Sequence, residues 1–228
     1  MRKIGIIGGL SWYSSMDYYR HINEIYQERS SKTNSAPLIL NSLNLETVST
    51  LFKKPNKAIE YLVKEAQRLE NAGCEILLIA SNTVHSAFSS IEDQTSMQCI
   101  HIADSCADKL KQDNMKKIAL LGTKYTLEKD FITQRLKQHD LEVFIPCKED
   151  IKTMQRYIET ELTLGIFSDE ARSFFIRVID DFKSQGVEAA IMACTEIPIL
   201  LKGSDIDIPL IDSCFEHCRD AVLKASSS

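Results

Sequence analysis

The sequence contains no long apolar run and no recognisable leader segment. No stretch approaches the roughly 20 apolar residues that a bilayer-spanning helix needs, so we expect a soluble protein. The first residues combine a basic tip with a short apolar run, but glycines interrupt that run and no small-residue cleavage site follows. A secretory signal peptide and a membrane partner are therefore not expected.

Blocks of like charge are also missing. The chain carries 27 Lys and Arg against 32 Asp and Glu, which gives a formal net charge of -5. A protein that binds the phosphate backbone usually shows a cluster of Lys and Arg or a stripe of basic and aromatic residues, and neither is present. We expect no nucleic-acid partner.

The seven cysteines lack a disulfide-like spacing. They stand at positions 74, 99, 106, 147, 194, 214 and 218, an odd set in a chain too large to need disulfide bridges. A reducing cytoplasm is the expected location. Cys214, His217 and Cys218 have a helical spacing that is also found in metal sites, but no second ligand pair at zinc-like spacing accompanies them. We expect buried helix thiols and no metal.

Short apolar runs alternate with amphipathic patterns along the 228 residues, a length that fits one compact unit or two half-size lobes. Continuous apolar runs are typical of strands buried on both faces, and they occur at 4–7, 76–80, 118–121 and 189–193. Apolar residues spaced by three and four predict helices in 57–72 and 171–184. This alternation predicts α/β architecture with parallel sheets.

The two halves of the chain resemble each other. Three pairs of segments align in the same order: Lys3–Gly8 with Lys117–Gly122, Ala72–Ser81 with Gln185–Cys194, and Asp104–Cys106 with Asp212–Cys214. We interpret this as a duplication into a first half, 1–113, and a second half, 114–228. The interpretation leaves open whether the C-terminal helix packs on the first half.

Ser81 and Cys194 occupy matching positions in this alignment, each just past a predicted strand. Two similar lobes related by a pseudo-twofold axis would place these strand ends across a cleft, and the carboxyl ends of parallel strands are where α/β sheets bind ligands. The simpler interpretation is that these turns only cap helices. Capping accounts for the residues from Ser81 to Thr83 and for Thr195, but it does not require a cysteine at 194.

Two side chains on opposite faces of a ligand suit inversion at a carbon that bears an acidic hydrogen. One group removes the proton and the other returns a proton to the opposite face, and a thiol is suited to both roles. The carbanion formed beside a carboxylate needs fixed hydrogen-bond donors. Candidate donors just past strand ends are Asn82, Thr83, Thr123 and Thr195, together with the main-chain N–H groups around Gly8, Gly9 and Ser11.

These segments carry a family resemblance. Ile7–Trp12, Ala80–His85, Leu121–Thr126 and Ala193–Pro198 resemble, in order, the GGMSW, CNTxH, GTxxT and GCTE motifs of the aspartate/glutamate racemase family. The resemblance implies two pseudo-symmetric α/β lobes with the active site between them, no pyridoxal phosphate or metal, and a homodimer. It also implies that Cys194 and position 81 are the two acid/base groups, and that the substrate carboxylate contacts Asn82, Thr83, Thr123 and Thr195. We add Ser11 as a substrate-binding candidate because of its main-chain N–H group.

The sequence departs from the family pattern in the first half. Ser81 stands where the paired thiol is expected, and a hydroxyl is a weak base unless a neighbour activates it. His85 lies four residues further on, and it either activates Ser81 or is a structural helix histidine. Ala193 replaces the usual glycine before the cysteine, which we regard as a minor change.

Two further departures concern the substrate side chain. Val48 and Leu164 align with positions where aspartate-selective relatives carry an Arg and a Lys for the side-chain carboxylate. Other cations could take that part or could simply be solvated surface charges: Arg20, Lys53, Lys54 and Lys124.

The sequence therefore predicts a cofactor-independent racemase of a small amino acid, with aspartate or glutamate as the first choice. A malonate-type decarboxylase that uses the single cysteine Cys194 is an alternative, because loss of carbon dioxide also leaves a carbanion that a thiol can protonate. A non-catalytic amino-acid-binding protein is a third hypothesis, supported by Ser81 and opposed by the segment Cys194–Glu196.

Overall fold

The computed structural model describes residues 1–31, 33–203 and 206–227. The chain forms two compact units: unit 1 contains residues 1–102 and the C-terminal residues from Cys214 onwards, and unit 2 contains Ala103–Ser213. The chain thus passes between the units after Ile102 and again after Ser213. Both crossings lie at or beside the repeated Asp-Ser-Cys segments. The expected halves, 1–113 and 114–228, were defined by sequence repetition, and the packing units divide the same chain differently.

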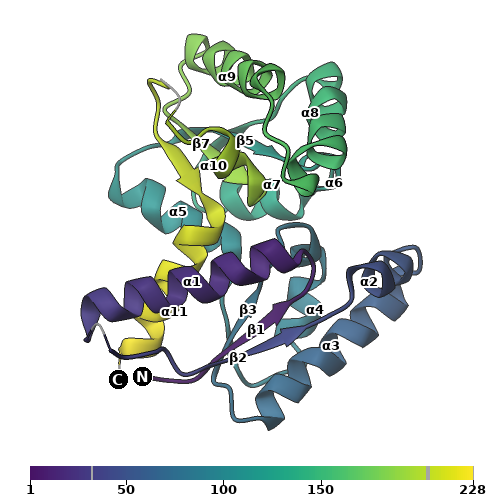
Figure 1. Cartoon of the computed structure of the whole chain (residues 1–228), viewed down its shortest axis with the longest axis vertical. Coiled ribbons are helices and arrows are strands. Elements are labelled where there is room, and N and C mark those ends of the chain that lie inside the picture. Colours follow the sequence, from purple (N-terminus) through teal and green to yellow (C-terminus); the bar gives the residue numbers. More distant parts are fainter. Residues whose placement is uncertain (32, 204–205, 228) are drawn as a thin grey trace. The chain divides into compact units, whose positions relative to one another are not determined.

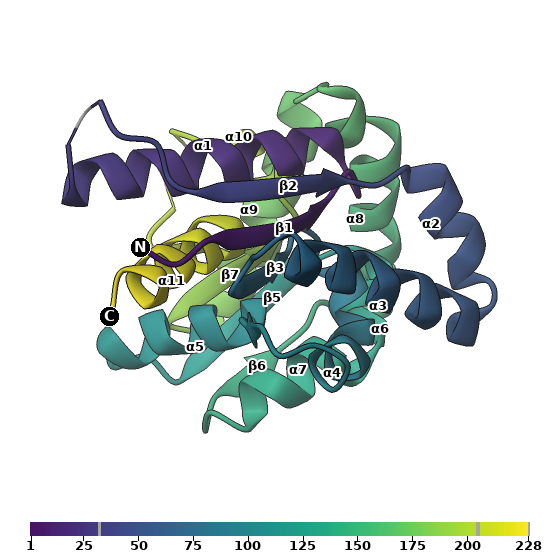
Figure 2. The ribbon, with the colours of Figure 1, turned by 90° about the horizontal axis from the view of Figure 1, so that it is seen from below.

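Unit 1 is built on a four-stranded sheet in which every pairing is parallel, with the order β2-β1-β3-β4. Its strands are β1 (Ile4–Gly8), β2 (Leu38–Ser42), β3 (Ile76–Ile79) and β4 (Gln98–Cys99). In Figure 2, β2 lies beside β1 and β1 beside β3. Its helical segments are α1 (Trp12–Arg29), α2 (Leu45–Phe52), α3 (Pro55–Asn71), η1 (Thr83–Ala87), α4 (Phe88–Glu92) and, apart from its first residue, α11 (Ser213–Ser226).

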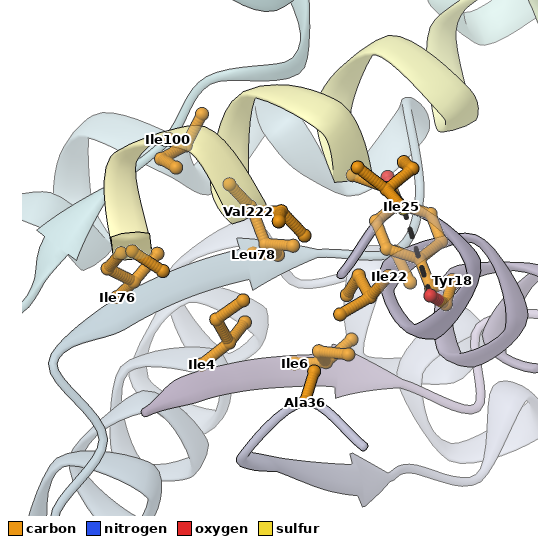
Figure 3. Close-up of a cluster of buried hydrophobic side chains, with 14 of the residues drawn as sticks. Ile4, Ile6, Tyr18, Ile22, Ile25, Ala36, Ile76, Leu78, Ile100 and Val222 are labelled. Carbon is orange, nitrogen blue, oxygen red and sulfur yellow. Dashed lines mark hydrogen bonds between the residues drawn. The ribbon is translucent and has the colours of Figure 1, made fainter. Parts of the chain in front are cut away.

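Apolar side chains fill both faces of this sheet, which explains the continuous apolar strands. Ile4 and Ile6 of β1 point to one face, where they meet α1 and α11 (Figure 3). Ile7 of the same strand belongs to a second cluster on the other face, which includes Leu62 of α3 and Phe88 of α4. Figure 1 shows α1 and α3 on opposite sides of the strands. Because each face is covered, the central strands β1 and β3 carry no polar alternation.

Unit 2 repeats the same architecture in the second part of the chain, with parallel strands in the order β6-β5-β7-β8. The strands are β5 (Lys117–Gly122), β6 (Glu142–Phe144), β7 (Ala189–Ala193) and β8 (Leu210–Asp212). The helical segments are α5 (Ile102–Gln112) apart from its first residue, α6 (Lys124–Glu128), α7 (Asp130–Lys137), α8 (Lys148–Thr160), η2 (Leu162–Leu164), α9 (Asp169–Ser184) and α10 (Glu196–Leu200). The two sheets have equivalent strand orders, so the predicted α/β fold with two parallel sheets is confirmed.

The predicted elements are found close to their expected positions. The helix expected in 57–72 is α3, and that expected in 171–184 is α9. Several helices begin after a side chain that accepts a main-chain N–H of the first turn, as N-caps do. These capping side chains belong to Ser11, Asn44, Thr123 and Ser168.

Candidate functional site

The turns after β1 and β3 of unit 1 are joined by hydrogen bonds. β1 and β3 are neighbours, and the N–H of Ala80 donates to the carbonyl of Ile7 at 2.9 Å. Ser11 caps α1, and the hydroxyl of Ser14 in that first turn donates to the carbonyl of Ala80 at 3.2 Å. The turn that holds Ser11 is thus fixed to the residue that precedes Ser81.

Gly9 allows the chain to turn sharply after β1. Its φ is +74°, and a Cβ at this position would lie 2.0 Å from the carbonyl oxygen of Leu43. The N–H of Gly9 donates to the hydroxyl of Ser15 at 2.7 Å. The expectation that main-chain N–H groups here bind an anion is therefore wrong for Gly9, because this donor is already bonded within the turn.

His85 is buried and is bonded to main-chain groups. Its Nδ1 donates to the carbonyl of Ser81 at 2.7 Å, and its Nε2 accepts the N–H of Ile102 at 3.2 Å. This pattern corresponds to the neutral ring with the proton on Nδ1. The hydroxyl of Ser81 is in contact with the N–H of Val84, at 3.4 Å. Of the two interpretations of His85, these bonds favour the structural one, because they hold the backbone of Ser81 and leave its hydroxyl untouched.

Asn82 and Thr83 follow Ser81 directly. Asn82 is the residue before η1, and Thr83 is the first residue of η1. Both residues are half-buried, as are Ser11 and Ser81. Within unit 1 the predicted residues therefore stand at the carboxyl ends of two adjacent strands and are not fully buried.

Unit 2 places Thr123 and Cys194 at matching strand ends. Gly122 of β5 is directly opposite Ala193 of β7, so the two residues that follow leave the sheet side by side. Thr123 caps α6 by accepting the N–H of Thr126 at 3.3 Å. Thr123 and Cys194 are each half-buried. The structure thus brings the predicted unit 2 residues together at one sheet edge.

A buried carboxylate accepts hydrogen bonds from both residues that precede it. The Cys194 thiol donates to Oε2 of Glu196 at 3.0 Å, and the Thr195 hydroxyl donates to the same oxygen at 2.9 Å. Burial raises the pKa of the Cys194 thiol well above its ordinary value, and the negative charge of Glu196 raises it further. Cys194 is therefore a thiol at neutral pH, and its proton points at a carboxylate.

Glu196 is the functional candidate that the sequence reasoning missed. It was included in the resembling segment Ala193–Pro198 but was given no role. The spacing itself was the available signal, because a carboxylate two residues after a cysteine at a strand end can turn back onto the thiol. In the internal alignment Glu196 matches Thr83, so the first half has no carboxylate at this position.

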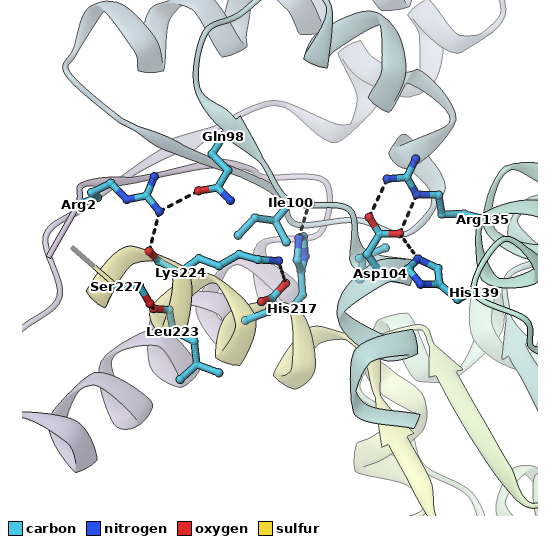
Figure 4. A network of polar contacts seen from close by, with 12 residues as sticks. Arg2, Gln98, Ile100, Asp104, Arg135, His139, His217, Leu223, Lys224 and Ser227 are labelled. Atoms are coloured by element: carbon cyan, nitrogen blue, oxygen red, sulfur yellow. Dashed lines mark hydrogen bonds and ion pairs between the residues drawn. The ribbon is translucent and has the colours of Figure 1, made fainter. Parts of the chain in front are cut away.

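The segment Cys214–Cys218 contributes to the core of unit 1. Cys214 and Cys218 belong to the cluster between β1, β3, α1 and α11. His217 donates from Nε2 to the carbonyl of Ile100 at 2.9 Å (Figure 4), and its Nδ1 accepts from the hydroxyl of Tyr18 at 2.7 Å. Over the described residues, no group of three or more His, Cys, Asp or Glu is arranged to hold a metal ion.

Two positions discussed for substrate selectivity differ in their surroundings. Val48 is buried in the cluster on the α3 face of unit 1, so it serves packing. Leu164 ends η2 and is 66% exposed, beside α10 in unit 2. Arg20 is paired with Asp17 and Glu24 on the surface of α1.

In the part of the chain that the structure describes, no helix is both long enough and apolar enough to cross a membrane.

Comparisons with known proteins agree with the fold. A crystal structure of a candidate Asp/Glu racemase from Yersinia pestis matches with a TM-score of 0.93 and 36% identity over 99% of both chains. An aspartate racemase homologue from Pyrococcus horikoshii OT3 matches with a TM-score of 0.90 and 31% identity over 100% of both chains. The broad specificity amino-acid racemase RacX of Bacillus subtilis (strain 168) is 22% identical over 152 residues, 67% of this chain and 65% of RacX. The chain spans 55% to 65% of the length of such curated relatives.

Two equivalent parallel sheets, each with polar residues at the ends of its two central strands, define an α/β protein with the racemase fold. The model of the Asp/Glu/Hydantoin racemase family matches residues 7–221, and the chain belongs to this family.

Proposed function

We propose that the protein is a cofactor-independent amino-acid racemase in which Cys194 transfers a proton at one face of Cα and Ser81 serves the other face. The observation that carries the proposal is the placement of the Cys194 thiol. It stands just past the end of β7, belongs to a half-buried residue, and is bonded to a carboxylate, in a chain that belongs to a racemase family. A thiol in contact with a proton acceptor is suited to acid–base chemistry.

The hydroxyl and amide groups beside these two residues bind the substrate carboxylate in this proposal. Removal of the α-proton pushes electron density onto that carboxylate, and fixed donors stabilise the developing charge. The proposed donors are Ser11, Asn82 and Thr83 in unit 1 and Thr123 and Thr195 in unit 2. Their partial exposure at strand ends supports the assignment.

Aspartate and glutamate are the first substrates to test, in line with the names of the relatives. The chain also offers a reason to include neutral amino acids. Val48 is part of the core and Leu164 is apolar, so neither supplies a cation for an acidic side chain. Lys124 is exposed on the first turn of α6 and is the cation that stands nearest to Thr123 in sequence.

The experiment incubates the purified protein with the L and D forms of aspartate, glutamate, methionine and lysine in heavy water, and follows α-deuterium by NMR. We expect exchange with at least one amino acid, and none with the Cys194→Ala variant. Cys147→Ala is the matched control, because Cys147 is an exposed cysteine of the same unit. Exchange that survives Cys194→Ala would contradict the site. Carbon dioxide release from malonates would favour a decarboxylase, and binding without either reaction would favour a binding protein.

We further propose that the protein works in the cytoplasm as a homodimer and that its halves, 1–113 and 114–228, arose by duplication. The seven free cysteines support a reducing compartment. The equivalent strand orders of the two sheets support the duplication. Light scattering after size-exclusion chromatography tests the dimer, and a monomer at the concentration used in the exchange assay would contradict it.

A further inference from the structure

Glu196 carries a carboxylate that accepts two hydrogen bonds and has little contact with water. It is 7% exposed and begins α10, and Oε2 accepts both the Cys194 thiol and the Thr195 hydroxyl. A thiol that donates to a carboxylate at 3.0 Å has a proton acceptor already in place. Glu196 is therefore placed to receive the thiol proton when the sulfur takes up another proton from a substrate.

Loss of the Cys194 proton to bulk water would be unfavourable. It would leave a thiolate and a carboxylate as two negative charges at contact distance in a poorly hydrated place. Transfer of the same proton to Glu196 keeps the pair at a single negative charge. The second route avoids the repulsion that the first one creates.

We propose that Cys194 and Glu196 form a proton relay, in which the thiol passes its own proton to Glu196 as its sulfur takes the proton from Cα. This inference rests on the proposed function. The Cα–H and original S–H bonds break while a new S–H bond and an O–H bond on Oε2 form. The electron pair of the broken Cα–H bond stays on the substrate and is delocalised into its carboxylate. The negative charge thus moves from Glu196 to the substrate, and the reverse steps return a proton to Cα.

Two charged residues near α10 are bonded to groups other than Glu196. Arg172 of α9 donates from Nε to the carbonyl of Leu200, at the other end of α10. Glu161, which precedes η2, accepts the hydroxyl of Ser168. The charge that acts on the Cys194 thiol together with burial is that of Glu196.

The first test is the pH dependence of α-deuterium exchange at the Cys194 face, measured with the amino acid that exchanges fastest in the panel. The relay works from the thiol and the neighbouring carboxylate and needs no thiolate in advance, so the wild-type rate should stay level through neutral pH. Glu196→Gln still accepts a hydrogen bond but cannot take up the proton. Its exchange should then depend on thiolate formed by loss of a proton to water, and should rise about tenfold per pH unit through neutral pH.

The sign of the effect at neutral pH separates the relay from a purely electrostatic role. We expect Glu196→Gln to slow exchange by about 10²-fold at neutral pH, as for loss of a general base. If Glu196 only holds the thiol protonated, its removal lowers the pKa of Cys194 and exchange becomes faster. A wild-type profile that already rises with slope one would also overturn the relay, and this result needs no variant. Glu142→Gln is the matched control, because Glu142 is an exposed carboxylate of the same unit, with its side chain 59% exposed.

A measurement without substrate separates this inference from the proposed function. The rate of Cys194 alkylation by iodoacetamide, followed on the Cys194 peptide by mass spectrometry, reports the thiolate alone. Removing the neighbouring negative charge should move its alkaline rise to lower pH in Glu196→Gln and leave it unchanged in Glu142→Gln. If the alkylation rate rises at the same pH in Glu196→Gln as in wild type, the contact between Cys194 and Glu196 is refuted. Suppose that the alkylation rate of Glu196→Gln rises at lower pH than that of wild type, but that the protein exchanges no amino acid. This result would refute the racemase proposal and the relay's role in it, and would still support the contact between Cys194 and Glu196.

Discussion

Gly9→Ala should be far more damaging than an alanine at another glycine of similar backbone conformation. Gly9 and Gly186 both have positive φ, +74° and +83°. A Cβ on Gly186 meets nothing within 4 Å, whereas a Cβ on Gly9 would lie 2.0 Å from the oxygen and 2.4 Å from the nitrogen of Leu43. Leu43 cannot easily withdraw, because its N–H donates to the carbonyl of Gly8 at 2.9 Å.

The losses of stability in the two variants therefore differ by the cost of the clash with Leu43, which only Gly9→Ala creates. Left-handed backbone costs a residue with a Cβ about 1–2 kcal/mol, and this is the whole expected cost of Gly186→Ala. Gly9→Ala adds about 1–3 kcal/mol of overpacking, for a total of about 2–5 kcal/mol. Equilibrium unfolding in urea measures the loss of stability in each variant. The loss appears as a lower midpoint concentration, with an unchanged dependence of the unfolding free energy on urea concentration. Gly9→Ala should also weaken exchange, because the turn carries Ser11. Equal midpoints for the two variants would refute this account of the turn.

Three further predictions concern other parts of the molecule. Cys99 should resist alkylation at neutral pH while Cys147 reacts, because burial raises the pKa of Cys99 to about 12 and Cys147 is exposed; peptide mapping that finds the reverse order would contradict this. Exchange activity should survive dialysis against a chelator and should not increase with added pyridoxal phosphate; a loss or a gain would show that a cofactor is needed. Tyr18→Phe should cost about 1–3 kcal/mol in urea unfolding, because it leaves Nδ1 of the buried His217 without this donor, and should leave exchange unchanged.

The strands could be predicted because each is a short apolar run buried on both faces. The internal repeat was also visible, but part of it has a structural meaning. Glu75 accepts the N–H of Lys3, and its counterpart Glu188 accepts the N–H groups of Lys116 and Lys117. These matched residues fix the start of a central strand in each unit. The sequence repeat therefore includes residues that stabilise equivalent turns as well as the candidate catalytic residues.

Other features depend on contacts that the sequence does not contain. The two-residue strand β4 is defined by its pairing with β3 and has no apolar pattern of its own. Asp104 belongs to a repeated segment, and its partners are the distant residues Arg135 and His139 (Figure 4). The bond from Cys194 to Glu196 is local, yet it depends on the side-chain conformation of a residue that could equally have faced solvent.

The asymmetry between Ser81 and Cys194 leads to the last prediction. Cys194 has Glu196 as a proton acceptor, whereas the position that matches Glu196 in the first half is Thr83. An alkoxide at Ser81 is also much harder to form than a thiolate. The enantiomer that presents its α-hydrogen to Cys194, which is the L form by family resemblance, should therefore exchange faster. The bias must appear in initial rates, because a catalyst cannot change the final ratio of enantiomers.

Ser81→Cys should speed racemisation, most clearly from the D side, because it places a second thiol at the matched position. Initial rates from pure L and pure D substrate are compared in wild type and Ser81→Cys, with circular dichroism to verify the fold. If the D-side rate is the same in wild type and Ser81→Cys, with the fold intact, Ser81 is not the second proton-transfer position.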